Sequence, residues 1–162
     1  MSGEKPCKSN GELLNALEAS GIIRDLNPDE LKALANLAEQ LTFPKDATII
    51  FEDDKSRDLY MICEGSVSIH ISLPSDHGRE EVLYTMREGQ IFGELALVDG
   101  SRRSASVRAE EPVRVYIFEY DKLNALFEKF PRIGFVLMRN IAAIIAQRVR
   151  NTNMLWRNSL VW

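Results

Sequence analysis

The residue types best suited to chemistry lie close together at positions 91–109, which read IFGELALVDGSRRSASVRA. Glu94 stands near the start of a predicted helical turn over residues 93–98, where unpaired backbone N–H groups suit an anion. Arg103 follows that turn after a glycine-containing loop. An arginine donates two parallel hydrogen bonds to a phosphate, whereas a carboxylate only accepts and therefore suits hydroxyl groups. Together the two side chains predict a site that holds a ribose hydroxyl and a phosphate.

Each of these two residues has a simpler interpretation when it is taken alone. Glu94 would then be an acid that caps a helix N-terminus, and Arg103 would be a surface charge at the start of a strand. The joint pattern, in which an acid, a glycine-containing loop and an arginine follow one another between predicted strands, favours the binding site over both simpler interpretations.

Other chemistry-bearing side chains are few and scattered. His70 alternates outward on a predicted strand and His77 lies in a predicted loop, so both are expected to be solvated. Cys63, in an apolar strand, is expected to be buried. Two histidines with so few partners cannot form a metal site, and no Ser-His-Asp or Cys-His arrangement is evident. The sequence therefore predicts neither a bound metal nor an enzymatic activity.

Length and composition narrow the remaining classes of protein. A chain of 162 residues, with 45% hydrophobic and 27% charged residues, fits one globular domain. A net charge of −4 gives no general attraction to nucleic acid or anionic membranes, and the apolar runs are too short to span a bilayer. Only two cysteines and no apolar signal segment at the N-terminus favour a cytoplasmic protein without disulfides.

Two helices are predicted ahead of the strands. Residues 1–10 are polar and are expected to form a flexible tail, and the leucines that follow predict a short helix that stops near Ser20. For the second helix, Asn27 is a good N-cap and Pro28 suits the first turn. Leucines at positions 31, 34, 37 and 41 keep helical spacing, so this helix is expected to continue to Leu41.

After Leu41 the hydrophobic period changes to that of strands. Strands are predicted at 48–51, 59–63, 66–72, 81–86, 105–109 and 113–118. In the strand at 66–72, Val67, Ile69 and Ile71 alternate with polar residues, which predicts one buried and one wet face. Many short strands at regular spacing favour a β-sandwich or a jelly-roll barrel.

The final third of the chain returns to helical spacing. A short helix over 120–129 is followed by a long one that begins at Pro131 and runs to about Trp156. Apolar residues cover more of the long helix than the roughly 100° face that a surface helix needs. One barrel cannot cover them all, so a homodimer through this helix is predicted. The residues expected in that contact are Leu137, Ile141, Ile144 and Ile145.

The motif FGELAL, then Gly100, then RRSASVRA resembles the phosphate-binding cassette of cyclic nucleotide-binding domains. LYMICEGSVSI at 59–69 and REGQIFGE at 87–94 resemble the elements ahead of that cassette in bacterial catabolite activator proteins and protein kinase A regulatory subunits. The resemblance covers about residues 26–153. It implies a mainly β fold, an eight-stranded jelly-roll barrel (double-stranded β-helix) with N-terminal helices and a long C-terminal helix, in one domain over residues 11–162.

The resemblance also implies roles for individual residues. Glu94 matches the residue that holds the ribose 2′-hydroxyl, with the backbone of Gly93 close to the sugar, and Arg103 matches the arginine that binds the cyclic phosphate. Ala96 matches a backbone N–H donor, whereas Arg102 falls outside the site as a solvated loop residue. The other positions implied around the ligand are Leu95, Ser104, Ala105, Ile69 and Leu83. The last two are expected to be core residues that line the base pocket.

The choice of nucleotide stays open between cAMP and cGMP. Family members that prefer cGMP often carry threonine where this chain has Ser104, and serine occurs there in the bacterial activator, so the residue leans toward cAMP. Thr152 and Asn153 lie where the activator has a Thr-Ser pair that reaches the adenine from the long helix. Met154 or Trp156 would instead cap the base by stacking, or these residues only pack at the helix end.

The leading hypothesis is a non-catalytic cAMP receptor that signals to an unknown protein partner by moving its C-terminal helix. The intact pair of Glu94 and Arg103 favours it over a ligand-free interaction domain of the same fold that dimerises through the long helix. A third hypothesis is the sensor fragment of a regulator similar to the catabolite activator. Only nine residues follow Asn153, too few for a helix-turn-helix, so no direct DNA binding and no membrane contact are expected of this chain.

Overall fold

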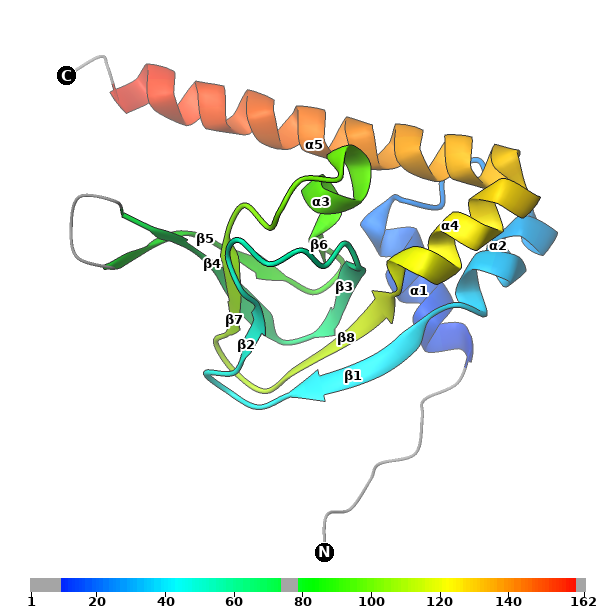
Figure 1. Ribbon diagram of the computed structural model, residues 1–162, viewed down its shortest axis with the longest axis horizontal. Coiled ribbons are helices and arrows are strands. Elements are labelled where there is room, and N and C mark those ends of the chain that lie inside the picture. Colours follow the sequence, from blue (N-terminus) through cyan, green and yellow to red (C-terminus); the bar gives the residue numbers. More distant parts are fainter. Residues whose placement is uncertain (1–9, 74–78, 160–162) are drawn as a thin grey trace, which may run out of the picture.

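The computed structural model describes residues 10–73 and 79–159, which form a barrel of strands with one long helix lying across it (Figure 1). Within these residues eight strands make two four-stranded antiparallel sheets, ordered β1-β8-β3-β6 and β2-β7-β4-β5. The predicted mainly β, eight-stranded jelly roll with flanking helices is confirmed. The strands are β1 Glu39–Phe43, β2 Thr48–Ile50, β3 Leu59–Glu64, β4 Ser66–Ser72, β5 Glu80–Arg87, β6 Ile91–Phe92, β7 Ser106–Ala109 and β8 Val113–Phe118.

Two short helices precede the barrel. α1 (Asn10–Ser20) ends where the sequence predicts, while the rest of the predicted tail, residues 1–9, lies outside the described residues, as does His77. α2 (Pro28–Ala35) begins with a reciprocal pair of bonds. The Glu30 N–H donates to the Asn27 side chain and the Asn27 N–H donates to the Glu30 carboxylate, both at 2.9 Å. This capping box explains why the helix starts at this point.

α2 is shorter than the sequence predicts. The expected continuation to Leu41 is wrong, because the helix ends at Ala35 and the chain then forms β1, in which Leu41 pairs with Val115 of β8. Helical preferences amount to only a few tenths of a kcal/mol per residue, so the backbone hydrogen bonds and side-chain contacts of a strand pairing override them.

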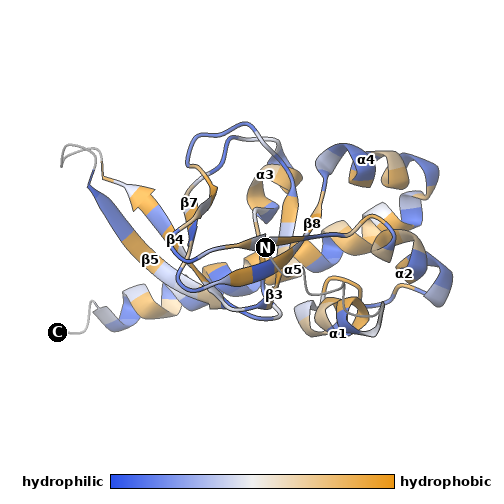
Figure 2. Ribbon diagram, turned by 90° about the horizontal axis from the view of Figure 1, so that it is seen from below, coloured by the Kyte–Doolittle hydropathy of each residue, from blue (hydrophilic) through white to orange (hydrophobic). Residues whose placement is uncertain are grey.

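Apolar side chains fill the barrel and the joint between the barrel and the helices. One buried cluster lies between the two sheets and includes Ile62, Val67 and Phe92. A second cluster joins the barrel to α1, α4 (Tyr120–Lys129) and α5 (Pro131–Ser159). Figure 2 shows α1, α2 and α4 gathered at one end of the molecule, away from β4 and β5. The segment from β6 into α3 (Glu94–Asp99) lies between the barrel and α5 (Figure 1).

The wet face predicted for β4 is wrong for most of the strand. Ser66, Ser68 and His70 are buried, and exposure begins only at the end of the strand. Ser66 donates to Glu111 at 2.7 Å, and Ser68 and His70 are hydrogen-bonded to each other at 2.8 Å. Buried polar groups need such hydrogen-bond partners. The alternating polar residues of β4 therefore form a buried, hydrogen-bonded face and not a face open to water.

α5 differs strongly between its two halves. Between residues 131 and 141, Ile133, Val136, Leu137 and Ile141 are buried in the core. Asn140 donates to the carbonyl oxygens of Ile22 and Arg24, both at 2.8 Å. Residues 149–159 are all exposed. Among the described residues no helix, α5 included, is both long and apolar enough to cross a bilayer. The helix is thus fixed to the molecule at its start and free along its end.

The dimer contact predicted for Leu137 and Ile141 is wrong, because both are fully buried inside the monomer. Ile144 and Ile145 are partly buried against the same core cluster, so their part in a dimer contact stays a prediction. The sequence argument failed because it assigned α5 to the barrel alone, whereas the N-terminal helices and α4 also cover it.

Candidate functional site

The predicted site lies where β6 turns into α3 (Glu94–Asp99), beneath α5 (Figure 1). Gly93 joins the two elements with a φ of 80°, in the left-handed region. A Cβ at this position would lie 2.6 Å from Nη1 of Arg103 and 2.9 Å from the carbonyl oxygen of Asp58. Glycine is therefore required here for its backbone angle and for the close approach of the arginine.

Arg103 is buried, with only 4% of its surface exposed, so its simpler interpretation as a surface charge is wrong. Its Nε donates to the Ser56 hydroxyl at 3.1 Å, Nη1 to the carbonyl oxygen of Gly93 at 2.8 Å, and Nη2 to that of Asp58 at 2.9 Å. An arginine has five N–H donors, so one on each terminal nitrogen is left for an oxyanion. Burial lowers the pKa of the guanidinium while nearby acids oppose the shift, and Arg103 stays charged at neutral pH.

Glu94 is buried as well, and its carboxylate has a partner that the sequence analysis missed. Arg148 of α5 donates from Nη1 to Oε1 of Glu94 and from Nη2 to the carbonyl oxygen of Ile91, both at 2.6 Å. The side chain of Glu94 is 7% exposed and that of Arg148 is 26% exposed. A buried carboxylate without a partner is unfavourable, so this ion pair holds Glu94 in its place.

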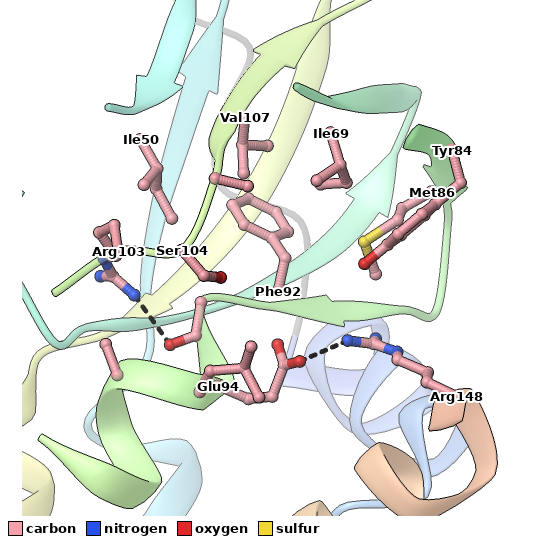
Figure 3. A pocket seen from close by; sticks show the side chains of 14 residues that line it. Ile50, Ile69, Tyr84, Met86, Phe92, Glu94, Arg103, Ser104, Val107 and Arg148 are labelled. Carbon is pink, nitrogen blue, oxygen red and sulfur yellow. Dashed lines mark hydrogen bonds and ion pairs between the residues drawn. The ribbon is translucent and has the colours of Figure 1, made fainter. Parts of the chain in front are cut away.

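A cavity of about 60 Å³ lies between the two buried charges. Figure 3 shows Arg103 at one end, and Tyr84 and Arg148 at the other. The predicted site residues that the structure brings together at this cavity are Gly93, Glu94, Leu95, Ala96, Arg103, Ser104, Ala105 and Ile69. One end offers donors to an oxyanion, the middle offers a carboxylate to hydroxyl groups, and the far end offers apolar and aromatic surface to a flat ring.

Leu83 does not belong to this group, and its prediction as a core residue that lines the base pocket is wrong. It is 51% exposed and does not line the cavity. Tyr84 pairs with Ile69 of β4, but the next pairing of the two strands skips Leu83, which is the extra residue of a β-bulge. Tyr84 and Met86, which lie two residues apart on one face of β5, line the cavity in its place.

Thr152 and Asn153 are also placed elsewhere, because both lie on the exposed half of α5 and neither lines the cavity. The residue that α5 brings to the cavity is Arg148, one turn earlier. The sequence did hold a signal for it. Arg148 follows Ile141 by seven positions and Ile144 by four, which places it on the buried face of the helix.

A second group of chemistry-bearing residues faces away from the cavity. Ser68 Oγ lies 2.8 Å from His70 Nε2, and His70 Nδ1 lies 3.8 Å from Oε2 of Glu80. His70 is buried, so its interpretation as a solvated residue is wrong. Both residues alternate with Ile69, which lines the cavity, and they therefore face the other side of the sheet. Across residues 10–73 and 79–159, potential metal ligands form no group of three or more.

The part of this chain that matches known proteins includes the strands of the barrel and most of the residues that line this cavity. The family model for the cyclic nucleotide-binding domain matches residues 40–130. A CRP-like cAMP-activated global transcriptional regulator from Mycobacterium tuberculosis is 31% identical over 137 residues, which are 85% of this chain and 58% of the regulator. The chain therefore spans little more than half the length of that relative.

Solved structures show the same architecture. The catabolite activator protein of Thermus thermophilus has a TM-score of 0.70 and 25% identity, over 85% of this chain and 62% of that one. A cyclic nucleotide-binding domain from Methylobacillus flagellatus has a TM-score of 0.78 over 87% of this chain and 80% of that one. Its identity is 24%, so this second likeness concerns the fold alone.

Proposed function

The chain belongs to the cyclic nucleotide-binding domain family, and we propose that it is a non-catalytic receptor for cAMP. In this proposal Arg103 binds the cyclic phosphate, Glu94 binds the ribose 2′-hydroxyl, and the purine lies at the apolar end beside Tyr84. The names of the relatives, which are cAMP-activated regulators, support cAMP over cGMP. Ser104 lines the cavity and is compatible with either nucleotide.

One observation carries the proposal: two opposite charges are buried at one small cavity without being paired to each other. Burial of an arginine and a glutamate is unfavourable unless each has partners. Arg103 is bonded to backbone and hydroxyl oxygens instead of Glu94, which leaves part of its fork for an anion. A ligand that carries an anion beside a hydroxyl group suits both side chains, and a cyclic nucleotide has this chemistry.

Calorimetric titration with cAMP, cGMP and 5′-AMP tests the proposal. We expect saturable binding of one cAMP per chain, with weaker binding of cGMP. The open 5′-AMP should bind more weakly still, because its phosphate is not held in a ring beside the ribose hydroxyl. Absence of binding by both cyclic nucleotides at millimolar concentration contradicts the proposal and favours the alternative of a ligand-free interaction domain.

We further propose that the exposed half of α5 carries the output of the receptor. Val149, Leu155 and Trp156 are each more than half exposed there, and grouped apolar side chains of this kind suit contact with another protein chain. A second copy about a two-fold axis is the simplest partner, and the double substitution Leu155→Glu, Trp156→Glu should then abolish dimers in sedimentation equilibrium. A monomeric parent protein contradicts this part of the proposal.

The free, buried thiol of Cys63 fits the reducing cytoplasm.

A further inference from the structure

The loop between β2 and β3 holds Arg103 through both its backbone and its side chain. The N–H of Asp53 donates to the carbonyl oxygen of Arg103, and the N–H of Arg103 donates to that of Asp54, both at 2.9 Å. The same loop reaches the guanidinium, because Nε of Arg103 donates to the Ser56 hydroxyl at 3.1 Å. Ser56 does not line the cavity but a separate, open groove. Its hydroxyl therefore holds the arginine from outside the space that a ligand would fill.

The direction of the hydrogen bonds at Ser56 is fixed by chemistry. An arginine N–H only donates, so the Ser56 oxygen must accept from Nε of Arg103. The hydroxyl proton is then given to Oδ2 of Asp54, at 2.8 Å. Hydrogen bonds from Ser56 and from the backbone N–H of Lys55 hold the pKa of the Asp54 carboxyl below its ordinary value. A charged carboxylate thus orients the hydroxyl, and the hydroxyl orients the guanidinium.

Ser56 also keeps two opposite charges apart. Within the described part of the chain, the acceptors of the Arg103 guanidinium are uncharged: one hydroxyl and two backbone carbonyls. The carboxylate of Asp54 stands one hydroxyl further away. A carboxylate in direct contact would offset the charge of the guanidinium and repel an incoming phosphate, whereas a hydroxyl does neither. The positive charge of Arg103 is therefore left for the ligand.

The bond to Nε sets which edge of the guanidinium faces the cavity. The group is planar, and its N–H bonds point in fixed directions. With Nε turned to Ser56, the N–H donors that remain are on the two terminal nitrogens, which also hold the carbonyl oxygens of Gly93 and Asp58. Two donors match the two non-bridging oxygens of a cyclic phosphodiester. The arginine is thus oriented for the phosphate before any ligand binds.

We propose that Ser56 is a positioning residue of the receptor: its neutral hydroxyl, oriented by Asp54, holds Nε of Arg103 so that both terminal nitrogens face the phosphate. The inference rests on the proposed function and assigns a role in affinity to a residue that touches no ligand. Without the hydroxyl, Nε loses its acceptor and the guanidinium is free to rotate, so that binding must first restore its orientation.

The first test measures cAMP affinity by calorimetry in variants of Ser56. Ser56→Ala should weaken binding about fivefold, the factor that corresponds to ~1 kcal/mol for one hydrogen bond. Ser56→Thr keeps the hydroxyl and should restore the parent affinity. Ser101→Ala is the matched control, because Ser101 likewise donates to an aspartate two residues earlier, Asp99, at 2.6 Å, while Arg103 donates to Ser56 and not to Ser101. S101A should keep the parent affinity.

A charged acceptor at the same position tests the need for a neutral one. Ser56→Asp should weaken cAMP binding about 30-fold, more than S56A, because its carboxylate would offset the charge of Arg103 as well as disturb its orientation. Parent affinity in S56A, a loss that S56T does not restore, or a smaller loss in S56D than in S56A overturns the role of Ser56 and leaves the receptor standing. Absence of cAMP binding by the parent overturns the receptor itself.

A second measurement needs no change at Ser56. In nitrogen-15 NMR spectra, the Nε–H signal of Arg103 is identified as the one that Arg103→Lys removes. Because Ser56 accepts this N–H in the free protein, its exchange with water should be slow both without and with saturating cAMP. Fast exchange in both states, or protection that appears only with cAMP, would show that Ser56 does not hold Nε, and either result overturns the inference even if S56A fails to fold.

Discussion

The two charged ends of the cavity are held in different ways. Arg103 is fixed by three oxygen atoms of the barrel, two of them backbone carbonyls, and is almost fully buried. Glu94 is held by the charged side chain of Arg148, which is partly exposed and comes from another element, α5. The first end has oxygen atoms of the barrel as partners, and the second has a charged side chain from another element.

This difference assigns different tasks to the two ends. A group whose partners are already in place binds its ligand without rearrangement, which favours affinity. A group that is held by a side chain of another element couples its ligand to that element wherever the ligand changes the contact between them. The Arg103 end should therefore dominate affinity, and the Glu94 end should dominate the response of α5.

The largest expected effect comes from removing the fixed end with Arg103→Ala. Charge-assisted hydrogen bonds contribute ~1.5–3 kcal/mol each, and ~1.4 kcal/mol corresponds to a factor of ten in affinity. Loss of a two-bonded arginine should therefore weaken cAMP binding by at least ~100-fold in calorimetry. Arg102→Ala is the control, because Arg102 is exposed and donates to the backbone of Asp53. An R103A protein that binds like the parent would falsify the phosphate assignment.

Gly93→Ala should displace the Arg103 side chain without removing it. The added Cβ would lie 2.6 Å from the Arg103 Nη1, so the guanidinium must move and cAMP affinity should fall roughly 30-fold, as expected for the loss of ~2 kcal/mol. Gly21→Ala is the matched control, since its φ of +76° carries the same backbone strain with no atom near the new Cβ. Both variants should lower the melting temperature, and only G93A should lower affinity. Equal affinity of the two contradicts the account.

Glu94→Gln weakens the end that Arg148 holds. We expect cAMP affinity to fall by about tenfold, less than for R103A, because a charged acceptor for the ribose hydroxyl becomes a neutral one while the phosphate contact stays. Asp99→Asn, at the other end of α3, is the control, because Asp99 bonds to Ser101 outside the cavity. If Glu94→Gln lost more affinity than R103A, Glu94 and not Arg103 would dominate the affinity for cAMP.

The smallest effect is expected at the apolar end, where Tyr84→Ala and Leu83→Ala test which of these two residues of β5 lies against the base. Aromatic contacts contribute ~0.5–1.5 kcal/mol, so Y84A should weaken cAMP binding by about threefold to tenfold. L83A should leave affinity unchanged, because Leu83 is half exposed on the bulge. If L83A weakened cAMP binding more than Y84A in a competition assay, the base would lie against Leu83.

Features fixed by local sequence were predictable. The Asn27 cap, the turn at Gly93 and the start of α5 at Pro131 each depend on residues within one turn of the chain. The burial of Arg103 and Glu94 at one cavity was also within reach, since both flank α3 and the short loop after it.

Features fixed by distant contacts were not predictable in the same way. Leu41 looked helical and became a strand residue because β8, far along the chain, pairs with it. The face of β5 that meets the cavity, with Tyr84 and Met86, is set by the pairing of β5 with β4, and Leu83 lies on a bulge that no local pattern in β5 marks. The spacing of Arg148 from Ile141 and Ile144 places it on the buried face of α5, but nothing local shows that its partner is Glu94, which lies on another element.

A crystal structure of the protein with cAMP tests the central claim most directly. The account predicts the cyclic phosphate within hydrogen-bonding distance of both terminal nitrogens of Arg103, the ribose 2′-hydroxyl on Glu94, and the base beside Tyr84. A nucleotide whose phosphate lies away from Arg103, or whose ribose lies away from Glu94, would contradict the receptor site.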